Sequence, residues 1–195
     1  KHSLVQCQKM NVKEAKLNLL ADPVLSWYDN NYREGVLKDD DKNDGLDILI
    51  SVMPLSAPEI VKSTEAGNDN QFLIDLYNII AELIGREHNI TLLVTDVKVD
   101  IGFALELKAL LLERLNKDIE IKIPTNVSEM FNYIHECDIL VATRMHSAIF
   151  SMTSGIPVIN FNWQPKVKGV FELTDMSEFL IEVSPTGGVS VDKTL

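Results

Sequence analysis

Arg144 and His146 lie two residues apart, directly after an apolar run and at the start of a segment with helical spacing. An arginine offers a planar fork of donors that matches a carboxylate or a phosphate group. An imidazole is the side chain best suited to move protons near neutral pH. We therefore predict that residues 144–146 bind an anion and place a proton donor or acceptor beside it.

Lys166 repeats this placement after the next apolar run, three residues beyond Trp163. In a parallel sheet the carboxyl ends of the strands lie along one edge, and ligands collect in the crevice outside that edge. A helix that starts there adds unpaired N–H groups and the positive end of its dipole. Lys166 is therefore predicted to reach the same crevice as Arg144 and His146.

The elements that position these residues follow from an alternation of strand-like and helix-like runs. This order is typical of an α/β fold with a doubly wound, mostly parallel sheet. Residues 28–45 are polar and rich in Asp and Asn, so we interpret them as a linker or an exposed crossover. The expected strands are 46–55, 89–97, 119–125, 138–143, 157–162 and 179–183, and the expected helices are 71–87, 102–116, 127–137, 146–155 and 165–174.

Composition and charge exclude several classes of protein. The chain has 195 residues and a net charge of −11 without a basic cluster, which excludes binding driven by a nucleic-acid backbone or an anionic membrane surface. Cys7 and Cys137 form no disulfide framework, which fits a reducing, cytoplasmic compartment. No run reaches the ~18 apolar residues of a membrane span. Because the chain begins with Lys, we expect it to be part of a longer protein.

The segment "DILVATRMHSAIFSMTSGIPVINFNWQPKVKG", residues 138–169, resembles the C-terminal signature of the polysaccharide pyruvyl transferase family. That signature has an Arg-x-His after a strand, small residues on the next helix, a Gly-x-Pro before another strand, and an aromatic-x-Pro-Lys segment followed by Gly. The matching residues here are Arg144, His146, Ser147, Gly155, Pro157, Trp163, Pro165, Lys166 and Gly169.

The resemblance implies a fold of two Rossmann-like domains that face each other across a cleft, as in GT-B glycosyltransferases. Residues 1–25 would be the tail end of an N-terminal domain, 26–46 an acidic linker, and 47–195 the C-terminal Rossmann-like domain. The rest of the N-terminal domain would then be a missing partner of this chain, which we expect to be inactive alone.

The resemblance also implies a reaction. A pyruvyl group would move from phosphoenolpyruvate, as co-substrate and without another cofactor, to sugar hydroxyls of a nucleotide- or lipid-linked saccharide. The product would be a ketal in cell-wall or exopolysaccharide biosynthesis, made in the cytoplasm or at the inner face of the membrane. His146 and Arg144 would be the catalytic residues, His146 through acid/base work or a hydrogen bond to phosphate. Arg144 and Lys166 would bind the anionic groups, and Ser147 and Trp163 would also bind substrate.

One departure from the family pattern lies after the strand at 47–52. The family often has a basic residue there, whereas this chain has Met53 followed by Pro54. Part of the anion site would then be absent. The alternatives are a GT-B glycosyltransferase that uses a nucleotide sugar, or a non-catalytic domain of a polysaccharide assembly complex.

Each candidate also has a purely structural interpretation. Arg144 can be a strand-end residue paired with a nearby carboxylate such as Asp138, and His146 a helix cap or a packed ring. Lys166 can be a solvated lysine, and Trp163 a core or interdomain contact.

Two further groups of residues also have more than one interpretation. Asp96 and Asp100 follow a predicted strand, so they would orient an acceptor hydroxyl or, alternatively, cap the next helix. His135, Cys137 and Asp138 suggest metal ligands, but they span a helix end and lack a second cluster, so no metal site is predicted.

Overall fold

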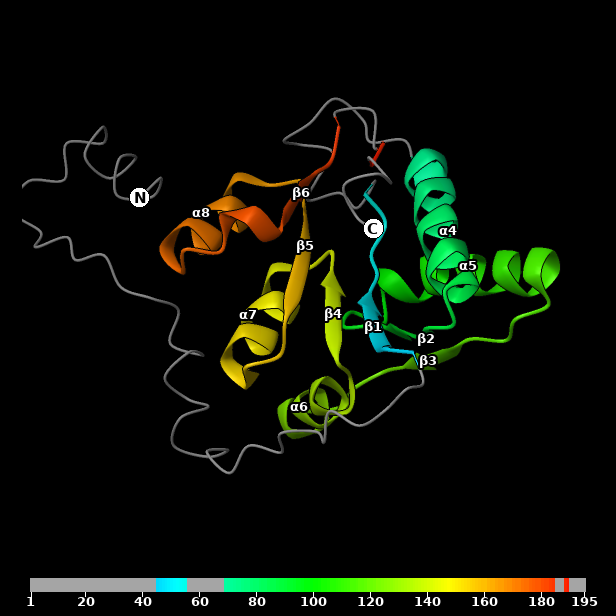
Figure 1. Cartoon of the computed structure of the whole chain (residues 1–195), viewed down its shortest axis with the longest axis horizontal. Helices are drawn as coiled ribbons and strands as arrows, with labels where there is room; N and C mark the ends of the chain where they lie inside the picture. The colour runs from blue at the N-terminus through cyan, green and yellow to red at the C-terminus, as the bar shows by residue number, and fades with distance from the viewer. Residues whose placement is uncertain (1–44, 56–68, 185–187, 190–195) are drawn as a thin grey trace, which may run out of the picture.

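The computed structural model describes residues 45–55, 69–184, 188 and 189. Strands and helices alternate through them, as the hydrophobic pattern predicts (Figure 1). The elements are β1 (Asp47–Ser51), α4 (Asp69–Gly85), β2 (Asn89–Leu93), α5 (Asp100–Leu115), β3 (Glu120–Lys122), α6 (Val127–Glu136), β4 (Ile139–Ala142), α7 (Met145–Ser154), β5 (Val158–Asn162), α8 (Pro165–Leu173), the 3-10 helix η1 (Ser177–Phe179) and β6 (Leu180–Glu182).

The strands form one six-stranded sheet in the order β3-β2-β1-β4-β5-β6. Every pairing between these strands is parallel. The chain runs outward from β1 in one direction and then returns to β4 on the other side of β1, so the strand order reverses between β1 and β4. This is the doubly wound, Rossmann-like arrangement, which places a ligand crevice at that reversal. The predicted α/β fold is confirmed.

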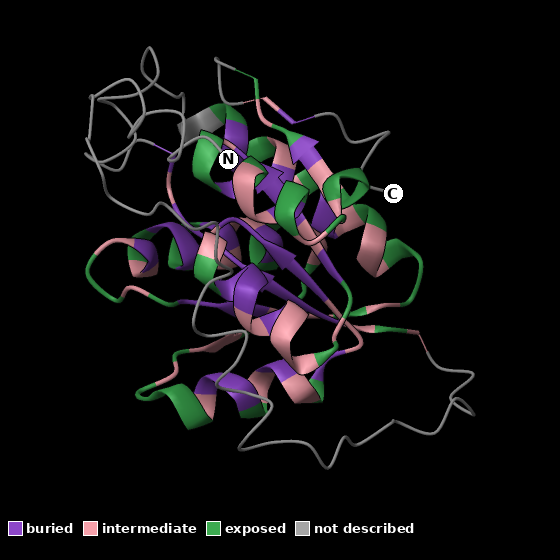
Figure 2. Cartoon of the chain, turned by 90° about the vertical axis from the view of Figure 1, so that its left-hand side faces the viewer, coloured by how far each residue is buried: buried purple, intermediate pink, exposed green. Residues whose placement is uncertain are grey.

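Helices cover both faces of the sheet, α4 and α5 one face and α6, α7 and α8 the other (Figures 1 and 2). Successive side chains of β1 point to opposite faces, so Ile48 and Ile50 join the α4–α5 core and Leu49 the other core. In the first core the Phe72 ring packs between Phe103 and Phe161. A strand that is buried on both faces must be apolar throughout, which explains the continuous apolar run of β1.

Local signals set the ends of the site-forming elements. Gly155 ends α7 in the left-handed conformation, at φ 71°, where a residue without a Cβ is favoured. β3 is shorter than expected because Pro124 cannot donate to a strand ladder. The 3-10 helix η1 was not predicted.

The predictions for residues 1–25 and 26–44 fall outside the described residues. Nothing in the described structure therefore tests an N-terminal domain tail or an acidic linker. In the ranges that are described, no helix is long and apolar enough to cross a membrane.

Candidate functional site

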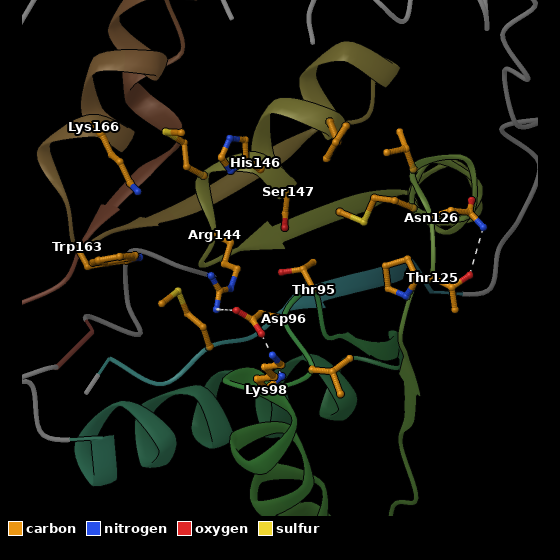
Figure 3. A pocket seen from close by; sticks show the side chains of 17 residues that line it. Thr95, Asp96, Lys98, Thr125, Asn126, Arg144, His146, Ser147, Trp163 and Lys166 are labelled. Atoms are coloured by element: carbon orange, nitrogen blue, oxygen red, sulfur yellow. Dashed lines mark hydrogen bonds and ion pairs between the residues drawn. The ribbon is translucent and has the colours of Figure 1, made fainter. Parts of the chain in front are cut away.

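A cavity of ≈ 680 Å³ opens at the carboxyl ends of the strands. Segments that follow β1, β2, β3, β4 and β5 all contribute to its wall, which places it at the reversal of strand order. All five predicted site residues line it, from the turns after β4 and β5 and from the first turns of α7 and α8 (Figure 3). The described lining residues are Met53, Thr95, Asp96, Val97, Lys98, Pro124, Thr125, Asn126, Val127, Met130, Arg144, Met145, His146, Ser147, Phe150, Trp163 and Lys166.

Two helices begin at this cavity with their N-termini uncapped. His146 is the second residue of α7 and Lys166 the second residue of α8. Neither helix has an acidic residue in its first turn or a side-chain cap hydrogen bond. The unpaired N–H groups and both dipoles therefore favour an anion in the cavity. His146 and Lys166 are both exposed there, so His146 is neither a side-chain cap nor a packed ring.

Two other helices that begin at this edge, α5 and α6, already carry their own negative charge. The α5 helix has Asp100 in its first turn, and α6 has Glu129. The side chain of Asn126 also caps α6 by accepting a hydrogen bond from the Glu129 N–H at 2.9 Å. An anionic ligand is therefore directed to α7 and α8 rather than to α5 and α6.

Arg144 pairs with Asp100 and not with Asp138. Its Nε and Nη2 atoms donate to the Asp100 carboxylate at 2.8 and 2.6 Å, in a two-point pair. Asp138 lies at the opposite end of β4, where it accepts a hydrogen bond from the Asp47 N–H at 2.7 Å. The alternative pairing is wrong because an extended strand separates the two residues by about 20 Å.

The ion pair changes what Arg144 can contribute. The Asp100 side chain is fully buried, whereas 23% of the Arg144 side chain remains exposed at the cavity. The buried Asp100 carboxylate therefore balances the Arg144 charge on the side away from the cavity. The planar two-point contact fixes the orientation of the guanidinium group. Within the described structure Nη1 makes no hydrogen bond, so it can donate to a ligand.

Asp96 and Asp100 do not cap α5. The N-cap position is held by Val99, without a side-chain hydrogen bond. Asp100 instead accepts a hydrogen bond from the Asp96 N–H at 3.0 Å, and the Asp96 Oδ1 atom accepts one from the Lys98 N–H at 3.0 Å. Both carboxylates thus organise the turn between β2 and α5.

Ser147 and Trp163 each combine a wall position with a structural contact. The Ser147 hydroxyl is buried and hydrogen-bonded to the Ser51 hydroxyl at 3.1 Å, which ties α7 to the end of β1. The half-buried Trp163 donates from Nε1 to the Thr143 carbonyl at 2.7 Å, and its ring also packs on the α4–α5 core. Trp163 therefore lines the cavity and also contacts the core, while its role as a wall of a substrate site stays a prediction.

The opposite wall was not predicted from the sequence. Thr125 and Asn126 lie in the turn between β3 and α6, where the carboxyl-end rule would have indicated a site. Glu129 holds Thr125 by accepting hydrogen bonds from its N–H at 2.7 Å and its hydroxyl at 2.8 Å. These bonds, with a third from the Tyr133 hydroxyl, lower the pKa of Glu129. The same hydrogen bond to Glu129 raises the pKa of Tyr133.

The cavity wall carries positive charge on an acidic protein. Its described cations are Lys98, Arg144 and Lys166, against the single carboxylate of Asp96. Met53, at the end of β1, is buried and uncharged. The cations therefore come from the segments after β2, β4 and β5.

The residues that suggested metal ligands lie away from this cavity. Cys137 is buried and donates from Sγ to the Ile134 carbonyl at 3.1 Å, at the C-terminal end of α6. Among the described residues, no group of three or more His, Cys, Asp or Glu side chains is placed to hold a metal ion.

A comparison with models of protein families identifies the family of this chain. The family model for polysaccharide pyruvyl transferase matches residues 6–165. This chain belongs to the polysaccharide pyruvyl transferase family. The match to this transferase family includes Arg144, His146, Ser147 and Trp163, and it ends one residue before Lys166. No solved structure matches the chain.

Proposed function

We propose that this chain is the C-terminal Rossmann-like domain of a GT-B-like, two-domain enzyme that transfers a pyruvyl group from phosphoenolpyruvate to saccharide hydroxyls. Phosphate is released and a ketal is formed on a nucleotide- or lipid-linked precursor of a cell-wall or exported polysaccharide. Residues 1–25 belong to the first domain in this proposal, and 26–46 form the linker. The reaction takes place in the cytoplasm or at the inner face of the membrane.

The observation that carries the proposal is the pair of uncapped helix N-termini on one cavity. Phosphoenolpyruvate has two anionic groups, a phosphate and a carboxylate. The α7 N-terminus supplies backbone N–H donors. The α8 N-terminus supplies its dipole and the Lys166 N–H, because Pro165 has no N–H and the Val167 N–H donates to the Gln164 carbonyl at 3.0 Å. Each helix also has a side chain with donor capacity at its second position, His146 in α7 and Lys166 in α8. Two anionic groups on one small molecule fit this arrangement better than one does.

The roles of the side chains follow from their surroundings. Lys166 is exposed and supplies a point charge to one anionic group, while Arg144 supplies an oriented donor whose net charge Asp100 already balances. His146 is exposed beside both, where it exchanges a proton with the reacting atoms or donates to the phosphate. Donors that are fixed before the reaction stabilise charge without reorganisation.

The test is a binding and turnover comparison on the full-length protein. Phosphoenolpyruvate binding is measured by calorimetry for wild type, Lys166→Ala, His146→Ala and Arg144→Ala. Lys168→Ala is the matched control, because Lys168 is exposed two residues further along α8 and does not line the cavity. Loss of one hydrogen bond to a charged group, worth about 1.5–3 kcal/mol, predicts that Lys166→Ala weakens binding roughly 10- to 150-fold.

The control should bind phosphoenolpyruvate as the wild type does. Ketal formation is followed in parallel as the appearance of a methyl signal by proton NMR. Unaltered binding and turnover in all three site variants would overturn the site assignment. If nucleotide sugars stabilise the wild-type protein against unfolding and phosphoenolpyruvate does not, the assignment of phosphoenolpyruvate as the donor is overturned.

A further inference from the structure

The two neighbouring carboxylates Asp96 and Asp100 lie in opposite environments. Asp100 is fully buried, and its oxygens accept hydrogen bonds from Arg144 at two points and from the Asp96 N–H. A carboxylate held this way cannot contact a ligand. Asp100 is therefore a positioning residue for Arg144.

Asp96 is open to the cavity. Its side chain is 43% exposed, and its Oδ1 atom accepts one hydrogen bond, from the Lys98 N–H of its own turn. Its Oδ2 atom lies 3.9 Å from Arg144 Nη2, which is an ion-pair distance but too far for a hydrogen bond. Oδ2 therefore keeps its capacity to accept. Among the described residues of the cavity wall, Asp96 is the sole carboxylate.

A carboxylate in this position determines which chemical groups can bind next to it. It repels the anionic groups that α7 and α8 attract, and it accepts hydrogen bonds from hydroxyl groups. In Figure 3, Lys166 and Trp163 lie on one side of Asp96, and Thr125 and Asn126 lie on the other. Thr125 and Asn126 are both exposed. The Thr125 hydroxyl donates to Glu129 and accepts from Asn126 Nδ2, and the Asn126 Oδ1 atom accepts from the Glu129 N–H, so an accepting lone pair on each oxygen and the second N–H of Asn126 Nδ2 are what these residues can offer to a sugar.

We propose that Asp96 binds the reacting hydroxyl of the acceptor saccharide and takes its proton. The acceptor then occupies the Asp96–Thr125–Asn126 side of the cavity, and the donor occupies the α7–α8 side. This inference rests on the proposed function, because it assigns the second substrate of the same reaction. Arg144, which contacts Asp100 and lies beside Asp96, marks the boundary between the two sides.

The proton transfers balance over the whole reaction. First the hydroxyl oxygen bonds to C2 of phosphoenolpyruvate, its proton passes to Asp96, and C3 takes a proton from His146 to become a methyl group. The C2–O bond to phosphate then breaks, and the phosphate leaves with the electron pair and the proton that Asp96 held. A second hydroxyl of the same sugar bonds to C2 in place of the phosphate and gives its proton to His146.

The test uses Asp96→Asn in the full-length protein. An asparagine keeps the Oδ1 acceptor for the Lys98 N–H and so preserves the turn, but it cannot take a proton. Asp118→Asn is the matched control, because it removes an exposed carboxylate that pairs with Lys108 outside the cavity. The acceptor probes are p-nitrophenyl glycosides of galactose, glucose, mannose and N-acetylmannosamine, with phosphate release and the ketal methyl signal as readouts.

Asp96→Asn should lower kcat about 10²- to 10⁴-fold, the usual contribution of a general base. Its dissociation constant for phosphoenolpyruvate should stay unchanged or fall, because a negative charge leaves the cavity. Turnover within a few-fold of the wild type would overturn the inference, as would loss of donor binding in parallel with turnover. Wild type that neither binds phosphoenolpyruvate nor converts any probe would instead refute the proposed function.

Discussion

The ion pair of Arg144 and Asp100 predicts that a substitution of Arg144 lowers the free energy of unfolding by more than a substitution of Asp100. Arg144→Met keeps most of the side-chain stem but leaves the Asp100 carboxylate buried without its counter-ion. Breaking a buried pair in this way costs about 3–5 kcal/mol. Asp100→Ala removes the buried charge itself, and Arg144, already 23% exposed, can turn to water.

The expected cost of Asp100→Ala is therefore smaller, about 1–3 kcal/mol, mainly from hydrogen bonds to charged groups that are not fully replaced by water. The double variant removes both charges at once. It should be more stable than Arg144→Met alone, with a coupling energy of about 1–3 kcal/mol between the two sites.

The assay is urea unfolding followed by circular dichroism, with the free energy of unfolding taken for each single variant and for the double variant. Arg86→Met is the matched control, because Arg86 forms a half-exposed pair with Glu82 at 3.2 Å on the surface of α4. That pair should contribute under about 1 kcal/mol. An Arg144→Met cost no larger than that of the control, or strict additivity in the double variant, would refute the reasoning.

Two further predictions concern the cavity walls. Glu129 has a lowered pKa because Thr125 and Tyr133 donate to it, so its stabilising contribution is complete above its ordinary value of 4.5 and is lost as pH falls through the lowered value. The stability gap between wild type and Glu129→Gln should hence be constant from pH 6 to 8 and shrink below about pH 4.5; urea midpoints that keep the same gap at pH 3.5 would contradict this. Trp163→Phe should cost about 0.5–1.5 kcal/mol, because it removes the hydrogen bond to the Thr143 carbonyl and keeps an aromatic ring. Thermal unfolding of this variant checks the value, and an unchanged midpoint would show that the bond contributes nothing.

The order and type of the elements were predictable because they depend on local patterns. Continuous apolar runs such as Ile139–Ala142 indicate strands buried on both faces, and Gly155 marks the end of α7 by its conformational freedom. The carboxyl-end rule then places Arg144, His146 and Lys166 on one edge of the sheet. These predictions needed only the periodicity of side chains and the direction of parallel strands.

The partner of Arg144 was not predictable in this way. Asp138 is six residues away in the sequence and Asp100 is 44 away, yet the structure pairs Arg144 with Asp100. β4 is extended and carries Asp138 to the far edge of the sheet, while the parallel order of β2, β1 and β4 brings the ends of distant segments together.

The sequence by itself therefore determined that Arg144, His146 and Lys166 reach the cavity, because strand direction and helix starts are encoded locally. Tertiary structure alone decided their charge environment. It buried Asp100 behind Arg144, left Asp96 open to the cavity, and put Thr125 and Asn126 on the opposite wall. Electrostatic partners depend on burial and on distances across the sheet, and neither quantity can be read from spacing along a single chain.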